Sequence, residues 1–259
     1  MKNEKLKRPI TKWSRRVIAT LFICGVLLLL IVLNPLLSYA NKTEHNEFAV
    51  FHNKPLTTGF SRSLDAATAL IRKSELYTAG FKIDLCLNDG SYYPSIIKTL
   101  KGDAFAFGFY NKVVLAGKED SLTGTMELNG YRWNLDQLLA HEIMHCFQYK
   151  DLGFWHSNPV AGIAEWKWEG YPEYIARQNA DQSDLKKNID KLIETEKTEH
   201  NGWISFSDGS GTVITYYKNW LLVQYCFNIR KMNWKQLLDE HIKEELINKE
   251  MMNWYQNQK

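Results

Sequence analysis

The chain contains few cysteines, and their distribution excludes a disulfide-stabilised scaffold. Only four of its 259 residues are cysteine. Cys24 lies in an apolar N-terminal segment, whereas Cys86, Cys146 and Cys226 are widely separated and odd in number. No Cys-x-x-Cys pair or Cys/His cluster occurs, so the sequence lacks the usual pattern of a structural metal site. A domain of this size does not need a disulfide framework, and the three cysteines fit either one bridge or buried free thiols.

The chain also lacks an excess of positive charge outside its first forty residues. Its 32 Lys and Arg and 29 Asp and Glu give a formal net charge of +3. Seven of the basic residues but only one acidic residue lie within 1–40, which leaves 25 basic against 28 acidic side chains in the remainder. Because nucleic-acid-binding domains concentrate positive charge on their folded part, we expect no nucleic-acid partner. A glycine-rich nucleotide-binding loop and an internal repeat are also absent from the sequence.

The first forty residues have the pattern of a targeting segment. Basic residues up to Arg16 precede an uncharged apolar stretch at 17–33. At ~1.5 Å rise per residue, a helix of this length covers most of the hydrocarbon core of a membrane, and its basic flank is expected to stay in the cytoplasm. We therefore expect the rest of the chain to be extracytoplasmic, in a periplasm or on the outer face of the cell membrane. Ser38-Tyr39-Ala40 fits a signal-peptidase site, so cleavage with secretion and retention as an anchor are both open, although the long apolar stretch favours the anchor.

The remaining sequence predicts one folded domain. Residues 41–60 are polar and mixed, and we expect them to act as a tether to a domain that spans about 48–259. Apolar segments of β type, at 82–88, 104–109 and 112–117, predict strands, and the pattern from Asn134 onward is mostly helical. Strands followed by helices is the order of an α+β fold. We expect a small mixed β-sheet followed by a mostly helical half.

A well-capped amphipathic helix opens that helical half. In the segment WNLDQLLAHEIMHCFQYKDLG, Asn134 is a good N-cap and Gln137 stands where it can complete a capping box. Apolar residues recur along one side of the segment, and Gly153 follows its expected end. The sequence therefore predicts a helix over about 135–152, on which the residues HEIMH occupy a central position.

The residues HEIMH have the spacing of a catalytic zinc site. His141 and His145 are four residues apart, so they project from one face of the helix and can bind one Zn²⁺ at ~2.0–2.1 Å each. Glu142 points to the neighbouring side, where it can act as a general base on a zinc-bound water. The alternative is a surface helix with two solvated histidines. Two apolar residues between the histidines favour a buried metal helix instead.

A third zinc ligand is required, and the spacing does not identify it. The next histidine after His145 is His156, and no HExxHxxGxxH pattern is present. Glu165, Glu169 and Glu173 follow at intervals of four in the segment GIAEWKWEGYPEYIARQ. On one continuous helix all three would share a face, so helical geometry leaves all three open.

The segment WKWEGYPEY, residues 166–174, resembles the W-x-x-E-G-x-x-x-Y segment of gluzincin metallopeptidases. The resemblance is closest to bacterial peptidase-MA-like domains, whose version reads E-G-L-A-E-Y, and more distant to aminopeptidase N. It implies that Glu169 is the third zinc ligand and that Glu173 is a supporting carboxylate. Glu165 has the spacing seen in thermolysin-like enzymes but lacks their surrounding residues. Pro172 departs from the family pattern, and because proline lacks an N–H it predicts that the helix begins or kinks here.

A later segment extends the resemblance, which covers about Tyr92 to Trp234. YYKNWLLVQY, residues 216–225, is similar to the Y-x-x-x-x-L-F-V-x-Y helix of peptidase-MA-like proteins. The resemblance implies that Tyr216 donates a hydrogen bond to the oxyanion of the tetrahedral intermediate, with Tyr217 as the next candidate. A phenol is a neutral donor that can stabilise developing negative charge. Core packing is the alternative role for an aromatic residue on such a helix.

These patterns together predict a membrane-attached zinc metallopeptidase that acts on a peptide or protein substrate. The predicted metal ligands are His141, His145 and Glu169, and the predicted catalytic residues are Glu142 and Tyr216. One alternative is a membrane-tethered binding protein on the same zincin-like fold, with little or no turnover. A second alternative is a zinc-free scaffold in which HEIMH is structural.

The predicted export can be tested with a topology reporter. A reporter domain fused after Lys54 should behave as extracytoplasmic, because the basic flank and the apolar stretch at 17–33 direct translocation of the residues C-terminal to them. Paired enzymatic reporters, one active only inside and one active only outside the cytoplasm, would measure this. Activity of the cytoplasmic reporter would exclude export.

Overall fold

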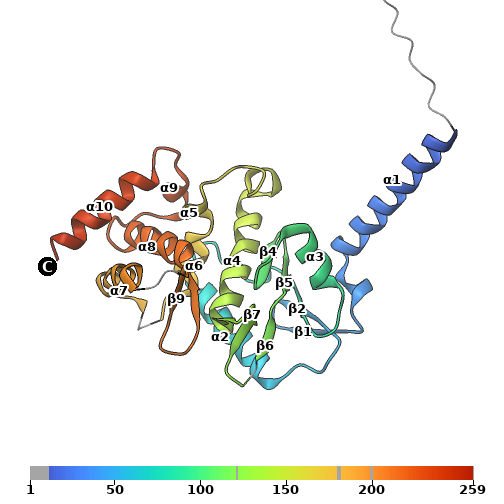
Figure 1. Ribbon diagram of the computed structural model, residues 1–259, viewed down its shortest axis with the longest axis horizontal. Helices are drawn as coiled ribbons and strands as arrows, with labels where there is room; N and C mark the ends of the chain where they lie inside the picture. The colour runs from blue at the N-terminus through green and yellow to red at the C-terminus, as the bar shows by residue number, and fades with distance from the viewer. Residues whose placement is uncertain (1–11, 121, 180–181, 199–200, 259) are drawn as a thin grey trace, which may run out of the picture.

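A long apolar helix, α1 (Lys12–Leu33), extends away from the folded body of the chain (Figure 1). The structure is a computed structural model and describes residues 12–120, 122–179, 182–198 and 201–258. Most of the predicted basic flank, at 1–11, therefore lies outside the described residues. Trp13–Leu33 is the one helix in the described ranges that is long and apolar enough to cross a membrane, and its most apolar window is not buried. The helix can be a membrane span or a signal segment.

Residues 41–60 do not form the predicted tether. β1 (Asn41–His45) and β2 (Phe48–His52) pair with each other at one edge of the main sheet, and α2 (Thr58–Ile71) follows. The sequence does not predict β1 as a strand because NKTEH is polar and almost fully exposed, whereas every residue of β2 is buried. The folded domain therefore begins before residue 48, and the short helix η1 (Pro35–Ser38) connects it directly to α1.

The main sheet has five strands in the order β1-β2-β3-β5-β4. β3 (Ile83–Cys86) pairs parallel with β2 and with β5 (Lys112–Leu115), whereas β4 (Ala106–Phe109) pairs antiparallel with β5. The mixed sheet and the tight β4–β5 hairpin agree with the predicted strands. Because β4 is the last strand in this order, it leaves one edge of the sheet free.

The two faces of the sheet are covered by different elements. One face packs against α2 and α4 (Leu135–Leu152) in the main core, where Val50, Leu85 and Val113 are fully buried. The other face packs against α3 (Tyr93–Lys101), Tyr39 and the end of α1, in a second apolar cluster that also includes Tyr93. The sheet therefore separates α4 from the N-terminal elements.

The rest of the described chain is mostly helical but includes two small antiparallel sheets. One sheet contains β6 (Lys118–Asp120), β7 (Thr125–Leu128) and β8 (Tyr131–Asn134), and the other contains β9 (Trp203–Ser205) and β10 (Gly211–Val213). The later helices are η2 (Phe154–His156), α5 (Glu165–Trp168), α6 (Gly170–Ala176), α7 (Leu185–Thr198), α8 (Ile214–Asn228), α9 (Trp234–Leu238) and α10 (Glu244–Gln256). The predicted α+β class is confirmed. The β9–β10 pair was not expected within the helical half.

α4 begins and ends where the sequence predicts, but its capping box is only half formed. Asn134 accepts a hydrogen bond from the backbone N–H of Gln137 at 3.2 Å, and Gly153 with φ of 75° follows the last turn. The Gln137 side chain does not return to the N-cap. Its amide oxygen accepts from Arg177 at 2.9 Å and its amide nitrogen donates to Gln182 at 2.8 Å. The buried guanidinium of Arg177 needs hydrogen-bond acceptors. The Gln137 side chain therefore bonds to Arg177 and not to the backbone N–H of Asn134.

β4 and α4 approach each other closely at Gly108. A Cβ atom added there would lie 2.2 Å from the carbonyl oxygen of Glu142 and 2.9 Å from Cβ of His145. Only a residue without a side chain allows the free edge strand to lie against the helix that carries HEIMH.

We expect Gly108→Ala to destabilise the protein by at least the ~1–3 kcal/mol typical of overpacked sites. The added Cβ would meet backbone, which no rotamer change can move. Gly124→Ala is the control, because its Cβ would meet nothing within 4 Å and its only penalty is the positive φ of 65°. Chemical denaturation measures both variants. A Gly108→Ala protein as stable as Gly124→Ala would contradict the close approach.

Candidate metal centre

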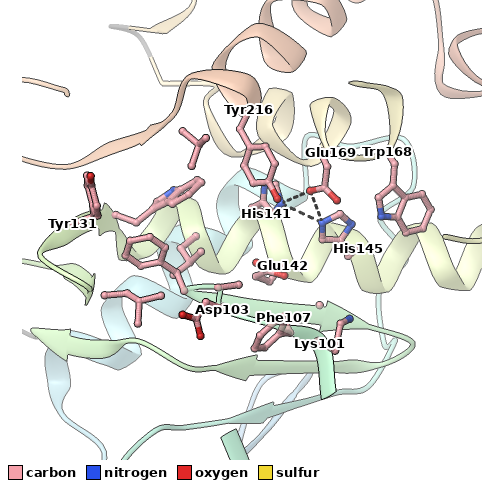
Figure 2. A pocket seen from close by; sticks show the side chains of 18 of the residues that line it. Lys101, Asp103, Phe107, Tyr131, His141, Glu142, His145, Trp168, Glu169 and Tyr216 are labelled. Atoms are coloured by element: carbon pink, nitrogen blue, oxygen red, sulfur yellow. Dashed lines mark hydrogen bonds and ion pairs between the residues drawn. The ribbon is translucent and has the colours of Figure 1, made fainter. Parts of the chain in front are cut away.

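A cavity of about 790 Å³ lies between α4, the free edge strand β4 and the helical half of the chain. All five predicted site residues line it, from three different elements: His141, Glu142, His145, Glu169 and Tyr216. Figure 2 shows Glu169 and Tyr216 reaching toward the two imidazoles from above, with β4 on the opposite side. The structure thus brings together residues that are up to 75 positions apart in the sequence.

The imidazoles of His141 and His145 converge on Glu169. Their Nε2 atoms are 3.1 Å apart, and each lies 3.2 Å from Oε2 of Glu169. The side chains of the two histidines are almost fully buried, and that of Glu169 is 17% exposed. The four-residue spacing on α4 aligns the histidines, whereas Glu169 arrives from a separate pair of helices. These three residues form a possible metal-binding group in the described part of the chain.

Glu169 lies at the junction of two short helices, not within one continuous helix. α5 ends at Trp168 and α6 begins at Gly170, which agrees with the break that Pro172 predicts. Gly170 allows α6 to pack tightly on α8, since a Cβ there would lie 2.6 Å from the carbonyl oxygen of Asn219. Glu165 is exposed and outside the metal-binding group. The three glutamates therefore have different environments despite their equal spacing.

A carbonyl left free by Pro172 helps to orient His145. The amide nitrogen of Gln148 donates to the carbonyl oxygen of Trp168 at 2.9 Å, and its amide oxygen lies 2.8 Å from Nδ1 of His145. Because that oxygen only accepts, Nδ1 of His145 donates to it, and the ring is held with Nε2 facing Glu169. The sequence motifs alone did not identify Gln148. The one feature of the sequence that points to Gln148 is its position three residues after His145 on the same helix.

His141 is held from behind by a buried carboxylate. One oxygen of Glu173 lies 3.4 Å from Nδ1 of His141, and the other accepts a hydrogen bond from Nε of Arg177. Glu173 and Arg177 are each only 1% exposed. Glu173 therefore lies behind the His141 ring at ion-pair distance, whereas Gln148 makes a direct hydrogen bond to His145. The i,i+4 spacing of Glu173 and Arg177 is a recognisable signal for an ion pair, but nothing in the local sequence indicates that the pair is buried.

Two largely buried carboxylates, Glu169 and Glu173, lie against the two histidines. Burial disfavours the charged form of His141, but hydrogen bonds to Glu169 and Glu173 outweigh burial and raise the pKa of His141 to about 10. Burial opposes ionisation of Glu169 and Glu173 as well. The nearby histidines, together with Arg177 for Glu173, nevertheless lower the pKa of both carboxyl groups. Arg177 compensates Glu173, so the Glu169 carboxylate requires a further cation, which a protonated histidine or a metal ion can supply.

The three convergent atoms fit a tetrahedral metal ion. A tetrahedral zinc site with ligand bonds of ~2.0 Å separates its ligand atoms by ~3.3 Å. The observed separations are 3.1 and 3.2 Å. When both Nε2 atoms are unprotonated, their lone pairs repel each other at this distance, and a cation between them removes the repulsion. Two imidazoles and one carboxylate also form a donor set typical of catalytic zinc.

Glu142 lies beside the metal-binding group but does not belong to it. The residue is only 7% exposed, and its side chain lines the cavity. Figure 2 shows Glu142 below the two imidazoles, toward β4. Its carboxylate makes no hydrogen bond with another side chain in the described ranges. The carboxylate is therefore available to a molecule that occupies the cavity.

The two adjacent tyrosines of α8 have different environments. The ring of Tyr216 stacks on the ring of His141, with centroids 5.9 Å apart and planes 16° from parallel. Burial and the neighbouring carboxylates raise the pKa of Tyr216, so its phenol stays protonated. Tyr217 is fully buried, and its hydroxyl donates to the carbonyl oxygen of Asn188 at 3.1 Å. Of the two residues, Tyr216 faces the cavity and Tyr217 faces the core.

Comparisons of the chain with protein-family models, curated proteins and solved structures found no match. The residues of this cavity and the motifs that they form are therefore the features that bear on its function.

We expect the purified protein to contain about one zinc ion per chain. His145→Ala and Glu169→Ala should each lose most of it, because each removes one of three ligand atoms. Glu165→Ala is the matched control, since the same substitution four residues earlier alters only an exposed side chain. Elemental analysis by mass spectrometry measures the content. Retention of zinc by Glu169→Ala together with its loss in Glu165→Ala would show that the third ligand is misassigned.

Proposed function

We propose that this chain is a zinc metallopeptidase of the gluzincin type that hydrolyses peptide bonds outside the cytoplasm. The observation that carries the proposal is the position of the Glu142 carboxylate beside three convergent ligand atoms in one cavity. A structural zinc site has four protein ligands, whereas the metal-binding group offers three. Three ligands next to an available carboxylate are what a hydrolytic site requires.

His141, His145 and Glu169 would hold the ion, and Gln148 and Glu173 would keep the two imidazoles oriented toward it. When bound, zinc supplies Lewis-acid polarisation and increases the acidity of water. The hydrogen bond between Nδ1 of His145 and Gln148 is already made in the structure, and the Glu173 carboxylate already lies at ion-pair distance from Nδ1 of His141, so little reorganisation is needed on binding.

Glu142 acts as the general base in this proposal. Its carboxylate can take a proton from the attacking water and later return it to the leaving amine. Two features support this role. The side chain lines the cavity, and it makes no competing hydrogen bond with another described side chain.

Tyr216 acts as the donor to the developing oxyanion. A phenol with a raised pKa remains protonated at neutral pH and can therefore donate a hydrogen bond to negative charge. Its stacking on His141 restrains the ring beside the metal-binding group. Both features support the role that the resemblance implies for this residue.

The same proposal includes two structural claims. The fold is zincin-like, and α1 attaches the domain to a membrane. Support for the fold comes from α4, which carries both histidines across one face of a mixed sheet whose free edge strand borders the cavity. Support for the attachment comes from the exposed apolar surface of α1 and from the basic residues that precede it. The domain would then stand on the extracytoplasmic side of the membrane.

Glu142→Gln tests the central claim, because it preserves the shape of the side chain and removes its basicity. We expect peptide hydrolysis to fall on the order of 10²–10⁴-fold, with zinc content and thermal stability unchanged. Mass spectrometry of peptide-library cleavage measures the turnover. Unaltered turnover would exclude Glu142 as the base. A wild-type protein that binds zinc and peptides but cleaves none would instead be a binding protein.

Tyr216→Phe tests the oxyanion donor against an adjacent control. We expect kcat to fall ~10²–10³-fold with KM little changed, because the hydroxyl acts only in the transition state. Tyr217→Phe should keep its kcat and lose about 0.5–1.5 kcal/mol of stability, because it loses the hydrogen bond to Asn188. Steady-state kinetics and denaturation measure the two effects. Equal kcat values for Tyr216→Phe and the wild type would remove Tyr216 from the mechanism.

A further inference from the structure

The C-terminal end of α1 is built into the folded domain. The hydroxyl of Tyr93 donates to the carbonyl oxygen of Val32 at 2.7 Å, and the hydroxyl of Ser91 donates to that of Ser38 at 2.8 Å. Tyr39 is buried, and its hydroxyl donates to the carbonyl oxygen of Leu87 at 2.8 Å. Cleavage after Ala40 would remove all three contacts. The junction therefore fixes the orientation of the domain relative to α1.

An apolar surface surrounds this junction. Leu36 and Leu37 of η1 are 54% and 66% exposed, directly after the apolar helix. Tyr92, the N-cap of α3, and Leu100 near its end are 83% and 55% exposed and eight positions apart, with half-buried Ile96 midway between them, so the three form one stripe. Tyr92 is adjacent to both Ser91 and Tyr93, the residues that bond to the junction.

A second apolar element lies on the same side of the molecule. Phe154 and Trp155 of η2 are 52% and 73% exposed, and their rings contact each other with centroids 5.2 Å apart. In Figure 1 α3 lies beside the point where α1 leaves, and the end of α4, which η2 follows, lies at the top of the domain, toward which α1 extends. Trp, Tyr and Leu side chains exposed together are typical of a surface that lies in the interfacial layer of a membrane.

We propose that this surface, made by Leu36, Leu37, Tyr92, Leu100, Phe154 and Trp155, rests on the bilayer that α1 spans. The inference depends on the membrane attachment in the proposed function but not on peptidase activity. Lipid is the occupant because the surface continues from α1 and because the junction hydrogen bonds hold it in a constant position relative to the span. A flexible tether would have allowed the domain to turn away, and between α1 and β1 the described chain instead forms η1 and joins the main sheet.

The docked orientation restricts how a substrate reaches the cavity. Leu100 belongs to the docked surface, and the next residue, Lys101, lines the cavity. One rim of the cavity would therefore lie close to the lipid headgroups. Peptide segments that emerge from the same membrane are the substrates best placed to enter it.

Site-directed spin labelling of the full chain in phosphatidylcholine–phosphatidylglycerol vesicles tests the docking. Cys24→Ser provides the background, because Cys86, Cys146 and Cys226 are fully buried. Single cysteines replace Leu37, Tyr92, Leu100 and Trp155, with Leu27→Cys as the reference inside the span. Leu246→Cys on α10 is the matched control, since this leucine is 46% exposed and α10 lies far from α1 in Figure 1.

We expect labels on the proposed surface to show an oxygen-to-nickel accessibility ratio several-fold above that of Leu246→Cys and below that of Leu27→Cys. Ratios equal to that of Leu246→Cys, with Leu27→Cys in lipid, would overturn the docking and leave the anchor intact. A water-exposed label at Leu27 would overturn both the docking and the membrane attachment. Spin–spin broadening at Leu100 that disappears on dilution with unlabelled protein would identify a second copy, not lipid, as the occupant. None of these outcomes depends on catalytic turnover.

Discussion

Pro172 has no N–H to offer to the carbonyl of Trp168, and much of the metal centre follows from that missing hydrogen bond. The chain breaks into α5 and α6 at this point, and Glu169 occupies the break. The free carbonyl accepts instead from Gln148, which in turn orients His145. A regular helix through residues 165–176 would have satisfied the carbonyl internally and left Gln148 without this partner. A residue that weakens the local helix thus connects the two segments that form the site.

Charge balance is the second constraint on the site. Glu169 and Glu173 are close to one pair of histidines in an almost dry environment, and Arg177 compensates only one of the two carboxylates. Buried carboxylates of this kind are strongly unfavourable without a compensating cation. The two carboxylates raise the pKa of His141 to about 10, against the effect of burial. The same uncompensated negative charge favours binding of a divalent cation by the group. A cation bound there would stabilise the core and also supply the chemistry proposed for the cavity.

The N-terminal junction contains regular structure that the sequence pattern does not reveal, because many of its side chains are exposed. β1 is an edge strand with both faces largely open, so its residues carry no alternation of apolar and polar side chains. Its backbone pairing with β2 nevertheless makes it part of the main sheet. Tyr39 is buried within Ser38-Tyr39-Ala40, the segment that fits a cleavage site. The segment whose composition predicts a tether is in fact part of the folded domain.

The sequence by itself determined the features that depend on local periodicity and on residue type. These are the α+β order of elements, the apolar N-terminal helix, the capped helix α4, and the spacing that puts His141 and His145 on one face. Side-chain period and capping act within a few residues, so they are readable along the chain. Only the tertiary structure decided which of the three equally spaced glutamates lies against Nε2 of both histidines, because the answer depends on a helix break and on close packing at Gly170. It also decided that Tyr216 faces the cavity while Tyr217 faces the core, since both lie on one helix whose apolar residues surround it. Distances between segments that are far apart in the chain are set by packing, and packing leaves no periodic signal in the sequence.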